Sequence, residues 1–308
     1  MSVLVFGTVA LDSVETPFGE AERVLGGSAV FFSAAASFLT PVRVVSVVGD
    51  DYPMEKLEFL ARRGVDLGGI ERADGESFFW SGRYSDDLNS RDTLETRLGV
   101  FADFRPHVPT EFRDASCVFL GNIDPVLQLE VLDQVRSPEI VACDTMNYWI
   151  EGSREALLEL LSRVDILLLN DAEARQLSGD HDLLRAAKWI QECGPGIVVV
   201  KKGEHGAILY GPDWIFFTPG FPLRMIADPT GAGDSFAGGF LGHLAAADSF
   251  CADDYKRAMV YGSTMGSFAV ESFSIDRFYS LKDRDILGRI LQFKEMTAFE
   301  HQLQAPNG

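Results

Sequence analysis

The chain has 308 residues, 46% of them hydrophobic, so it can bury the core of one large α/β domain or of two smaller ones. Its formal net charge of -19 argues against a nucleic-acid partner, because phosphate contacts need a basic face. Widely spaced cysteines without metal-type clusters, and the lack of an apolar run long enough to span a bilayer, lead us to expect a cytoplasmic protein without a membrane partner.

The first predicted strand covers residues 3–7 and is followed by the carboxylate of Asp12. Loops after such strands hold ligand groups in α/β proteins, so Asp12 is either a hydroxyl-binding residue or a turn acid. A short β excursion over residues 14–25 leads to Gly26 and Gly27, which open a helix rich in small and aromatic residues.

A second sheet is predicted beside the main one. Residues 41–48 and 53–63 continue the alternation of strand and helix, whereas residues 76–98 contain two strands joined by a polar turn. Together with the excursion they can form a small separate sheet, approximately from residues 12–25 and 76–105. Three polar side chains of this region are candidates for reaching a substrate: Asn89, Arg91 and Arg105.

The central strands are predicted over residues 116–120, 139–143 and 164–169, and each is followed by polar residues. Asp144 and Asn147 follow the second of these strands and are either neighbours of a phosphate or magnesium ion or parts of a capping loop. Asn170 and Glu173 follow the third strand with the spacing of a helix capping box.

The next strand, residues 197–201, ends at Lys201 and is followed by Gly203 and Gly206, then by a hairpin. A lysine at a strand end suits a phosphate contact. The predicted helix over residues 254–270 carries small residues, Ser263 among them, that permit a flat ring to lie against it. Residues 283–297 are predicted to close the fold with an amphipathic helix.

The stretch DPTGAGDSF, residues 228–236, joins two glycines, an acid and a buried helix predicted over residues 235–247. Free N–H groups at a helix N-terminus, helped by the helix dipole, form a site for a phosphate or a developing anion. A carboxylate at Asp234 would repel that anion unless it accepts a proton from an attacking hydroxyl. The alternative is a loop that only caps the helix.

This stretch resembles the C-terminal signature of the ribokinase-like, or PfkB-type, carbohydrate kinases. The GG pair, the N-x-x-E motif and the K-K-G-x-x-G motif stand in the family's order along the chain. The resemblance implies an α/β fold with a doubly wound, mostly parallel sheet flanked by helices, and a small β-sheet lid. It also implies that residues 1–308 form a single ribokinase-like domain.

The resemblance also assigns roles to individual residues. It implies that Asp234 is the catalytic base beside an anion hole, that a group of residues binds the acceptor, and that another binds ATP. Glu173 would help to hold magnesium, through water. The anion hole comprises Gly231, Ala232 and Gly233; the acceptor group is Asp12, Gly26, Gly27 and Phe31; the ATP group is Asn170, Lys201, Gly203, Gly206 and Ser263.

Phe31 departs from the family pattern, which has an Asn four residues after the second glycine. We therefore expect Phe31 either to pack away from the pocket or to meet an apolar or aromatic part of the acceptor.

The sequence thus predicts an ATP-dependent phosphotransferase that uses Mg²⁺ and phosphorylates a hydroxyl of a sugar or sugar-like molecule. A nucleoside kinase of the same fold and a non-catalytic nucleotide-binding regulatory protein are the alternatives. Activation by a monovalent cation and a homodimer formed through the lid are left open.

Overall fold

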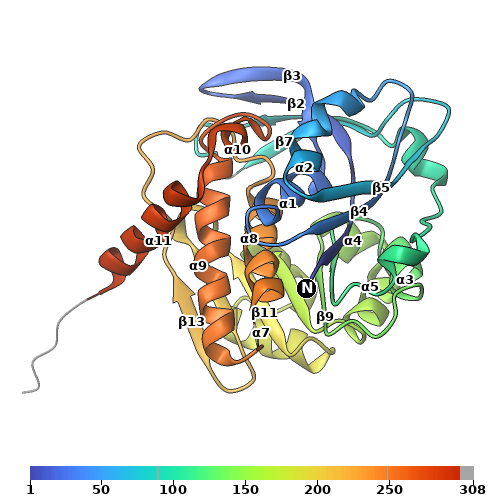
Figure 1. Ribbon diagram of the computed structural model, residues 1–308. Coiled ribbons are helices and arrows are strands. Elements are labelled where there is room, and N and C mark those ends of the chain that lie inside the picture. Colours follow the sequence, from blue (N-terminus) through green and yellow to red (C-terminus); the bar gives the residue numbers. More distant parts are fainter. Residues whose placement is uncertain (89, 248, 299–308) are drawn as a thin grey trace, which may run out of the picture.

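The computed structural model describes residues 1–88, 90–247 and 249–298 (Figure 1). Within these residues, nine strands form the central sheet in the order β13-β12-β11-β10-β9-β8-β1-β4-β5. All neighbours are parallel except β11–β12 and β12–β13, which are antiparallel. This confirms the predicted sheet. Its strands are β1 (Val3–Phe6), β4 (Val42–Val48), β5 (Val65–Arg72), β8 (Cys117–Leu120), β9 (Ile140–Asp144), β10 (Ile166–Asn170), β11 (Ile197–Lys201), β12 (Ala207–Tyr210) and β13 (Ile215–Thr218).

Each face of this sheet carries its own hydrophobic core, because successive side chains of a strand point to opposite faces. In β1, Val3 and Val5 join the first core while Leu4 and Phe6 join the second. Helices on the first face are α1 (Ser28–Ala36), α2 (Glu58–Arg62), α8 (Ala232–Ala246), α9 (Ala252–Ala269), α10 (Asp276–Ser280) and α11 (Asp283–Thr297). On the second face lie α3 (Pro125–Leu132), α4 (Asn147–Gly152), α5 (Arg154–Leu161), α6 (Asp171–Ser178) and α7 (Leu183–Glu192).

Helix α8 lies between α1 and α9 and is almost wholly buried. A side chain at Gly238 would come within 2.4 Å of the Phe32 carbonyl oxygen of α1, and one at Gly239 within 2.6 Å of the Tyr261 carbonyl oxygen of α9. These two glycines therefore allow both helices to approach α8 closely. The helix that carries Asp234 is held from two sides.

The smaller sheet has the strand order β3-β2-β6-β7 and extends from the body as a lid (Figure 1). Its outer pairs are antiparallel hairpins, and its middle pair, β2–β6, is parallel. This is the predicted second sheet, although residues 99–103 form a 3-10 helix and Asn89 lies outside the described residues. The strands are β2 (Ala10–Thr16), β3 (Gly19–Gly26), β6 (Phe79–Tyr84) and β7 (Arg91–Arg97).

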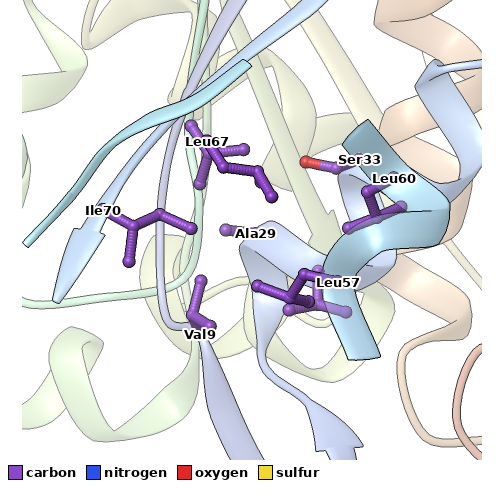
Figure 2. A pocket seen from close by; sticks show the side chains of 9 residues that line it. Val9, Ala29, Ser33, Leu57, Leu60, Leu67 and Ile70 are labelled. Atoms are coloured by element: carbon purple, nitrogen blue, oxygen red, sulfur yellow. The ribbon is translucent and has the colours of Figure 1, made fainter. Parts of the chain in front are cut away.

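The helix predicted over residues 53–63 is split into a 3-10 turn, Met54–Leu57, and the short helix α2. Strand β5 follows and pairs with β4. This strand escapes prediction because Gly68 and Gly69 interrupt its apolar pattern. Figure 2 shows Leu67 and Ile70 of β5 facing Leu57 and Leu60. The space between them is apolar and has no room for a water molecule, so it belongs to the core.

Among the described residues, no helix combines the length and the apolar character needed to cross a membrane.

Candidate active site

The turn before α8 has the geometry of an anion site. Gly231 caps the helix with φ 72° and ψ 3°, and no side chain caps the N-terminus. The helix begins at Ala232, three residues before the predicted start, so Asp234 lies in its first turn. The Ala232 N–H donates to the Pro229 carbonyl oxygen at 3.2 Å, whereas within the described chain the amides of Gly231 and Gly233 have no hydrogen-bond partner. Two of the three predicted amides are thus available to an anion; a contribution from Ala232 stays a prediction.

Phe31 of α1 supports this turn. The side chain is 2% exposed, and a Cβ at Gly231 would lie 2.2 Å from its ring atom Cγ. The ring therefore packs directly on the backbone of Gly231. Direct contact between Phe31 and an acceptor stays a prediction, but the ring fixes the position of the glycine that shapes the anion site.

Lys201 at the end of β11 brings a positive charge to the same turn. Its Nζ donates to Asp144 Oδ2 at 2.6 Å and lies 3.0 Å from the position of a Cβ at Gly233. Burial disfavours the Lys201 cation, but the charges of Asp144 and Glu173 outweigh this and raise its pKa. The predicted phosphate-binding lysine, the acid after β9 and the signature turn are thus assembled in one place.

The N-x-x-E motif forms the predicted capping box at the start of α6. The Glu173 N–H donates to Asn170 Oδ1 at 2.8 Å, and the Asn170 N–H donates to Glu173 Oε2 at 2.7 Å. Asn170 pairs with Lys201 in the β10–β11 register, so the motif lies beside the lysine. Capping leaves the half-buried Glu173 within electrostatic range of Asp144 and Lys201.

Asp12 lies across the site on β2 and is 5% exposed. A side chain at Gly26 would collide with its carboxylate, since the Cβ position is 2.0 Å from Asp12 Oδ2. Gly27 has φ 94°, and a Cβ there would lie 2.4 Å from the Thr8 carbonyl oxygen. The GG pair therefore leaves room for the Asp12 carboxylate.

The carboxylates of the site share an unusual electrostatic environment. Burial raises the pKa of Asp12 to about 7, and the negative charge of Asp228 adds to the rise, while the Gly27 amide opposes it. Burial, and then the charge of Asp144, likewise raise the pKa of Glu173 and of Asp234 to about 7, with Lys201 acting in the opposite direction. An Asp234 pKa near neutrality suits a general base, which needs a proton affinity close to the operating pH.

The lid contributes two residues. Thr230 Oγ1 of the signature donates to the Tyr84 hydroxyl of β6 at 3.2 Å, a contact between residues 146 positions apart that no local pattern indicates. Arg91, a candidate from the sequence, lowers the pKa of Asp12, Glu173 and Asp234, so its charge reaches the site. Arg105 instead donates to the Phe104 carbonyl oxygen.

Asp228 is the first residue of the DPTGAGDSF stretch, and the sequence does not predict it as a site residue. It is 1% exposed, and its Oδ1 accepts from the Thr230 N–H at 2.8 Å. Burial raises its pKa. It therefore forms a second buried carboxylate beside Asp12.

The remaining nucleotide candidates lie at the edge of this arrangement. Gly203 and Gly206 have φ values of 55° and 85° in the turn between β11 and β12. The Ser263 hydroxyl on α9 is buried and, within the described residues, lacks a hydrogen-bond partner. Asn147 is exposed at the start of α4. Contacts of these residues with ATP stay predictions.

The donor set fits Mg²⁺ that is shared with phosphates. In the described parts of the chain, no group of three or more His, Cys, Asp or Glu side chains is arranged to hold a metal ion by itself. Mg²⁺ in nucleotide sites typically uses one or two carboxylates, substrate phosphates and waters. Asp144 and Glu173 can supply such carboxylates.

A carboxylate in the first turn of α8, free amides before it and a lysine at a strand end together fit a phosphotransferase site on a ribokinase-like fold. Residues 11–278 match the pfkB family of carbohydrate kinases, and the chain belongs to this family.

Similar proteins agree with this assignment. The cytidine kinase of Thermococcus kodakarensis is 30% identical over 246 residues, 78% of this chain and 87% of that protein. The nucleoside kinase of Methanocaldococcus jannaschii is 24% identical over 262 residues, 84% of this chain and 83% of that protein. A putative ribokinase II from E. coli has the same fold, with a TM-score of 0.78 at 20% identity, over 95% of this chain and all of that one. The protein is therefore a phosphotransferase with a hydroxyl acceptor, and its family implies ATP and Mg²⁺.

The raised pKa of Asp234 predicts the pH dependence of catalysis. The carboxylate must be ionised to accept a proton, so kcat/KM should rise about tenfold per pH unit below pH 7 and level off above it. Initial rates between pH 5.5 and 8.5, with Mg²⁺ in excess over ATP, measure this profile. A flat profile over that range would show that Asp234 is not the titrating base.

The contact between Gly231 and Phe31 predicts the effect of Gly231→Ala. The new methyl group meets the ring and the residue is strained at φ 72°, a cost of about 1–3 kcal/mol. We expect turnover to fall about 10²-fold and the melting temperature to drop by a few degrees. The control is Gly288→Ala on α11, where no atom lies within 4 Å of the added Cβ. Equal behaviour of the two variants would contradict this account.

Burial of the Asp12 charge predicts a stability gain in Asp12→Asn. The folded-state pKa of about 7 lies above the usual aspartate value of 3.8. The ionised carboxylate therefore lowers the stability of the folded state by its full amount above pH 7 and does not affect it below about pH 4. Asp12→Asn should raise the melting temperature by a few degrees at pH 8, much less at pH 5, and should impair turnover. Thermal unfolding at both pH values tests this, with the exposed Asp74→Asn as control. A melting temperature unchanged at pH 8 would count against it.

Proposed function

We propose that the protein is a nucleoside kinase, which transfers the γ-phosphoryl group of ATP to a hydroxyl of a nucleoside. The observation that carries the chemistry is Asp234 in the first turn of α8, beside the free amides of Gly231 and Gly233 and next to Lys201. The acceptor class is supported by the relatives, named cytidine kinase and nucleoside kinase, which match about four fifths of the chain. A free sugar is the alternative acceptor.

In the proposed reaction Asp12 accepts a hydrogen bond from an acceptor hydroxyl and so orients the molecule. Asp234 takes the proton of the attacking hydroxyl as its oxygen forms a bond to the γ-phosphorus. The bond from this phosphorus to the β–γ bridging oxygen breaks, and ADP leaves with the electron pair. The amides of Gly231 and Gly233 and the Lys201 ammonium stabilise the charge on the transferring group.

The positions of Asp144 and Glu173 suit Mg²⁺ at the phosphates. Bound Mg²⁺ supplies positive charge that neutralises the phosphate oxygens. Glu173 keeps its place through the capping box, and Asp144 is held by Lys201 and by the Thr145 N–H, which donates to Asp144 Oδ1 at 2.8 Å. Both carboxylates are thus fixed before any ligand binds.

We also propose activation by a monovalent cation near Asp228. In the described residues this buried carboxylate has no ion-pair partner, and a cation would offset its charge.

A homodimer through the lid is a further proposal. It is supported by two exposed apolar side chains of the lid, Phe18, which is 57% exposed, and Leu94, which is 47% exposed. Rates in potassium against tetramethylammonium salts, and sedimentation velocity, test the two proposals.

The acceptor is tested by ADP release with cytidine, adenosine, inosine, ribose and fructose. We expect kcat/KM for at least one nucleoside to exceed that for either sugar by tenfold or more. Preference for a free sugar would restore the sugar-kinase alternative. ATP binding without turnover on any compound would favour the non-catalytic regulatory alternative.

The same assay includes Asp234→Asn, which should lower kcat by about 10²–10⁴-fold and change ATP affinity only a few-fold. The control is Asp171→Asn at the first residue of α6, whose carboxylate pairs with Arg175. Near-normal turnover in Asp234→Asn would exclude its role as base.

A further inference from the structure

The inner face of the lid carries an arginine that the proposed mechanism does not use. Arg91 opens β7 and pairs with Tyr84 across the β6–β7 hairpin. Paired residues of neighbouring strands project to the same face of a sheet. The Tyr84 hydroxyl meets Thr230 of the signature, so this face of the lid is turned toward the start of α8. Arg91 therefore lies on the side of the lid that faces the site.

The surroundings of Arg91 leave its charge available. Its Cζ lies 5.5 Å from the centroid of the Trp80 ring, which orients the guanidinium. Within the described chain Arg91 forms no ion pair, although the neighbouring lid arginines do: Arg83 pairs with Glu15 at 2.6 Å and Arg97 with Glu76 at 2.9 Å. The Tyr84 hydroxyl is a hydrogen-bond partner of Arg91, but within the described chain no carboxylate pairs with the guanidinium, so it can bind an anion.

The carboxylates that respond to Arg91 locate its charge. Burial raises the pKa of each of Asp12, Glu173 and Asp234, and Arg91 opposes the rise in all three. Asp12 belongs to the proposed acceptor side, Glu173 to the proposed phosphate side, and Asp234 lies between. The charge of Arg91 thus reaches carboxylates on both sides of the site, in keeping with its place on the lid face that meets Thr230.

The body of the protein brings a lysine to this site. Lys201 is the cation on the body side, but it is bound to Asp144. In the transition state, the transferring phosphoryl group spreads negative charge over its outer oxygens, and cations on more than one side are needed to stabilise it.

We propose that Arg91 is a catalytic residue, which reaches from the lid to the transferring phosphoryl group and stabilises its charge opposite Lys201. It exchanges no proton and makes no covalent bond. Because Arg91 is part of the lid, this charge is in place only when the lid contacts the signature turn. The proposal rests on phosphoryl transfer at Asp234, and not on the identity of the acceptor.

The test compares Arg91→Ala and Arg91→Lys with Arg83→Ala, a control on the adjacent strand whose side chain pairs with Glu15 on the other face. With ATP and cytidine, or the best acceptor of the panel, Arg91→Ala should lower kcat by about 10²-fold with little change in the acceptor KM. Guanidinium chloride at millimolar concentration should partly restore this rate and leave Arg83→Ala unaffected. Arg91→Lys should be intermediate, because an ammonium cannot bind two oxygens in the fork geometry of a guanidinium.

Two results would overturn the proposal. One is an unchanged kcat in Arg91→Ala; the other is a raised acceptor KM at constant kcat, which would make Arg91 an acceptor-binding residue. If no acceptor is turned over, calorimetric titration still decides: Arg91→Ala should weaken ATP about tenfold and ADP less than twofold. If Arg91→Ala weakens the binding of ATP and ADP equally, or weakens neither, the role proposed for Arg91 is wrong. The proposed nucleoside specificity is tested separately, by the panel of acceptors.

Discussion

The ion pair between Lys201 and Asp144 joins three parts of the chain on which the site depends. It links the ends of β11 and β9, and the lysine lies against Gly233 at the start of α8. Withdrawing two charges from water is costly, so a buried pair is retained only where further polar groups compensate. Here Glu173 and Asp234 surround the lysine with additional negative charge. Removal of either partner would leave an uncompensated charge among the carboxylates.

The site gathers several carboxylates in a small, largely buried space. Such an arrangement lowers the stability of the folded state, so stability alone would not favour it. Asp12, Asp228, Glu173 and Asp234 are all shifted toward the protonated form by burial. Each ionised carboxylate therefore destabilises the folded state near neutral pH. Functional sites commonly hold strained or mutually repelling groups of this kind, and the extensive cores on both faces of the sheet offset their cost.

The sequence predicts those parts of the fold and of the site that depend on local pattern. The parallel strands, the capping box at Asn170 and the closing helix follow from apolar runs and from short-range spacing. Strand β5 is missed because adjacent glycines hide its pattern. The Tyr84–Thr230 contact depends on the folding of the lid over the body, and the position of the Phe31 ring depends on how closely α1 approaches α8. Side-chain partners that are brought together only by the tertiary fold leave no trace in local spacing.

The topology of the lid has a consequence for acceptor binding. Asp12 belongs to β2, and this strand is paired with β3 on one side and β6 on the other. The acceptor-binding carboxylate proposed here is thus a part of the lid sheet rather than of the main sheet beneath it. Any displacement of the lid from α8 carries Asp12 away from Asp234 and dismantles the acceptor site. Acceptor binding and the contact of the lid with α8 are thus coupled through one sheet, so that an intact acceptor site and a displaced lid exclude each other.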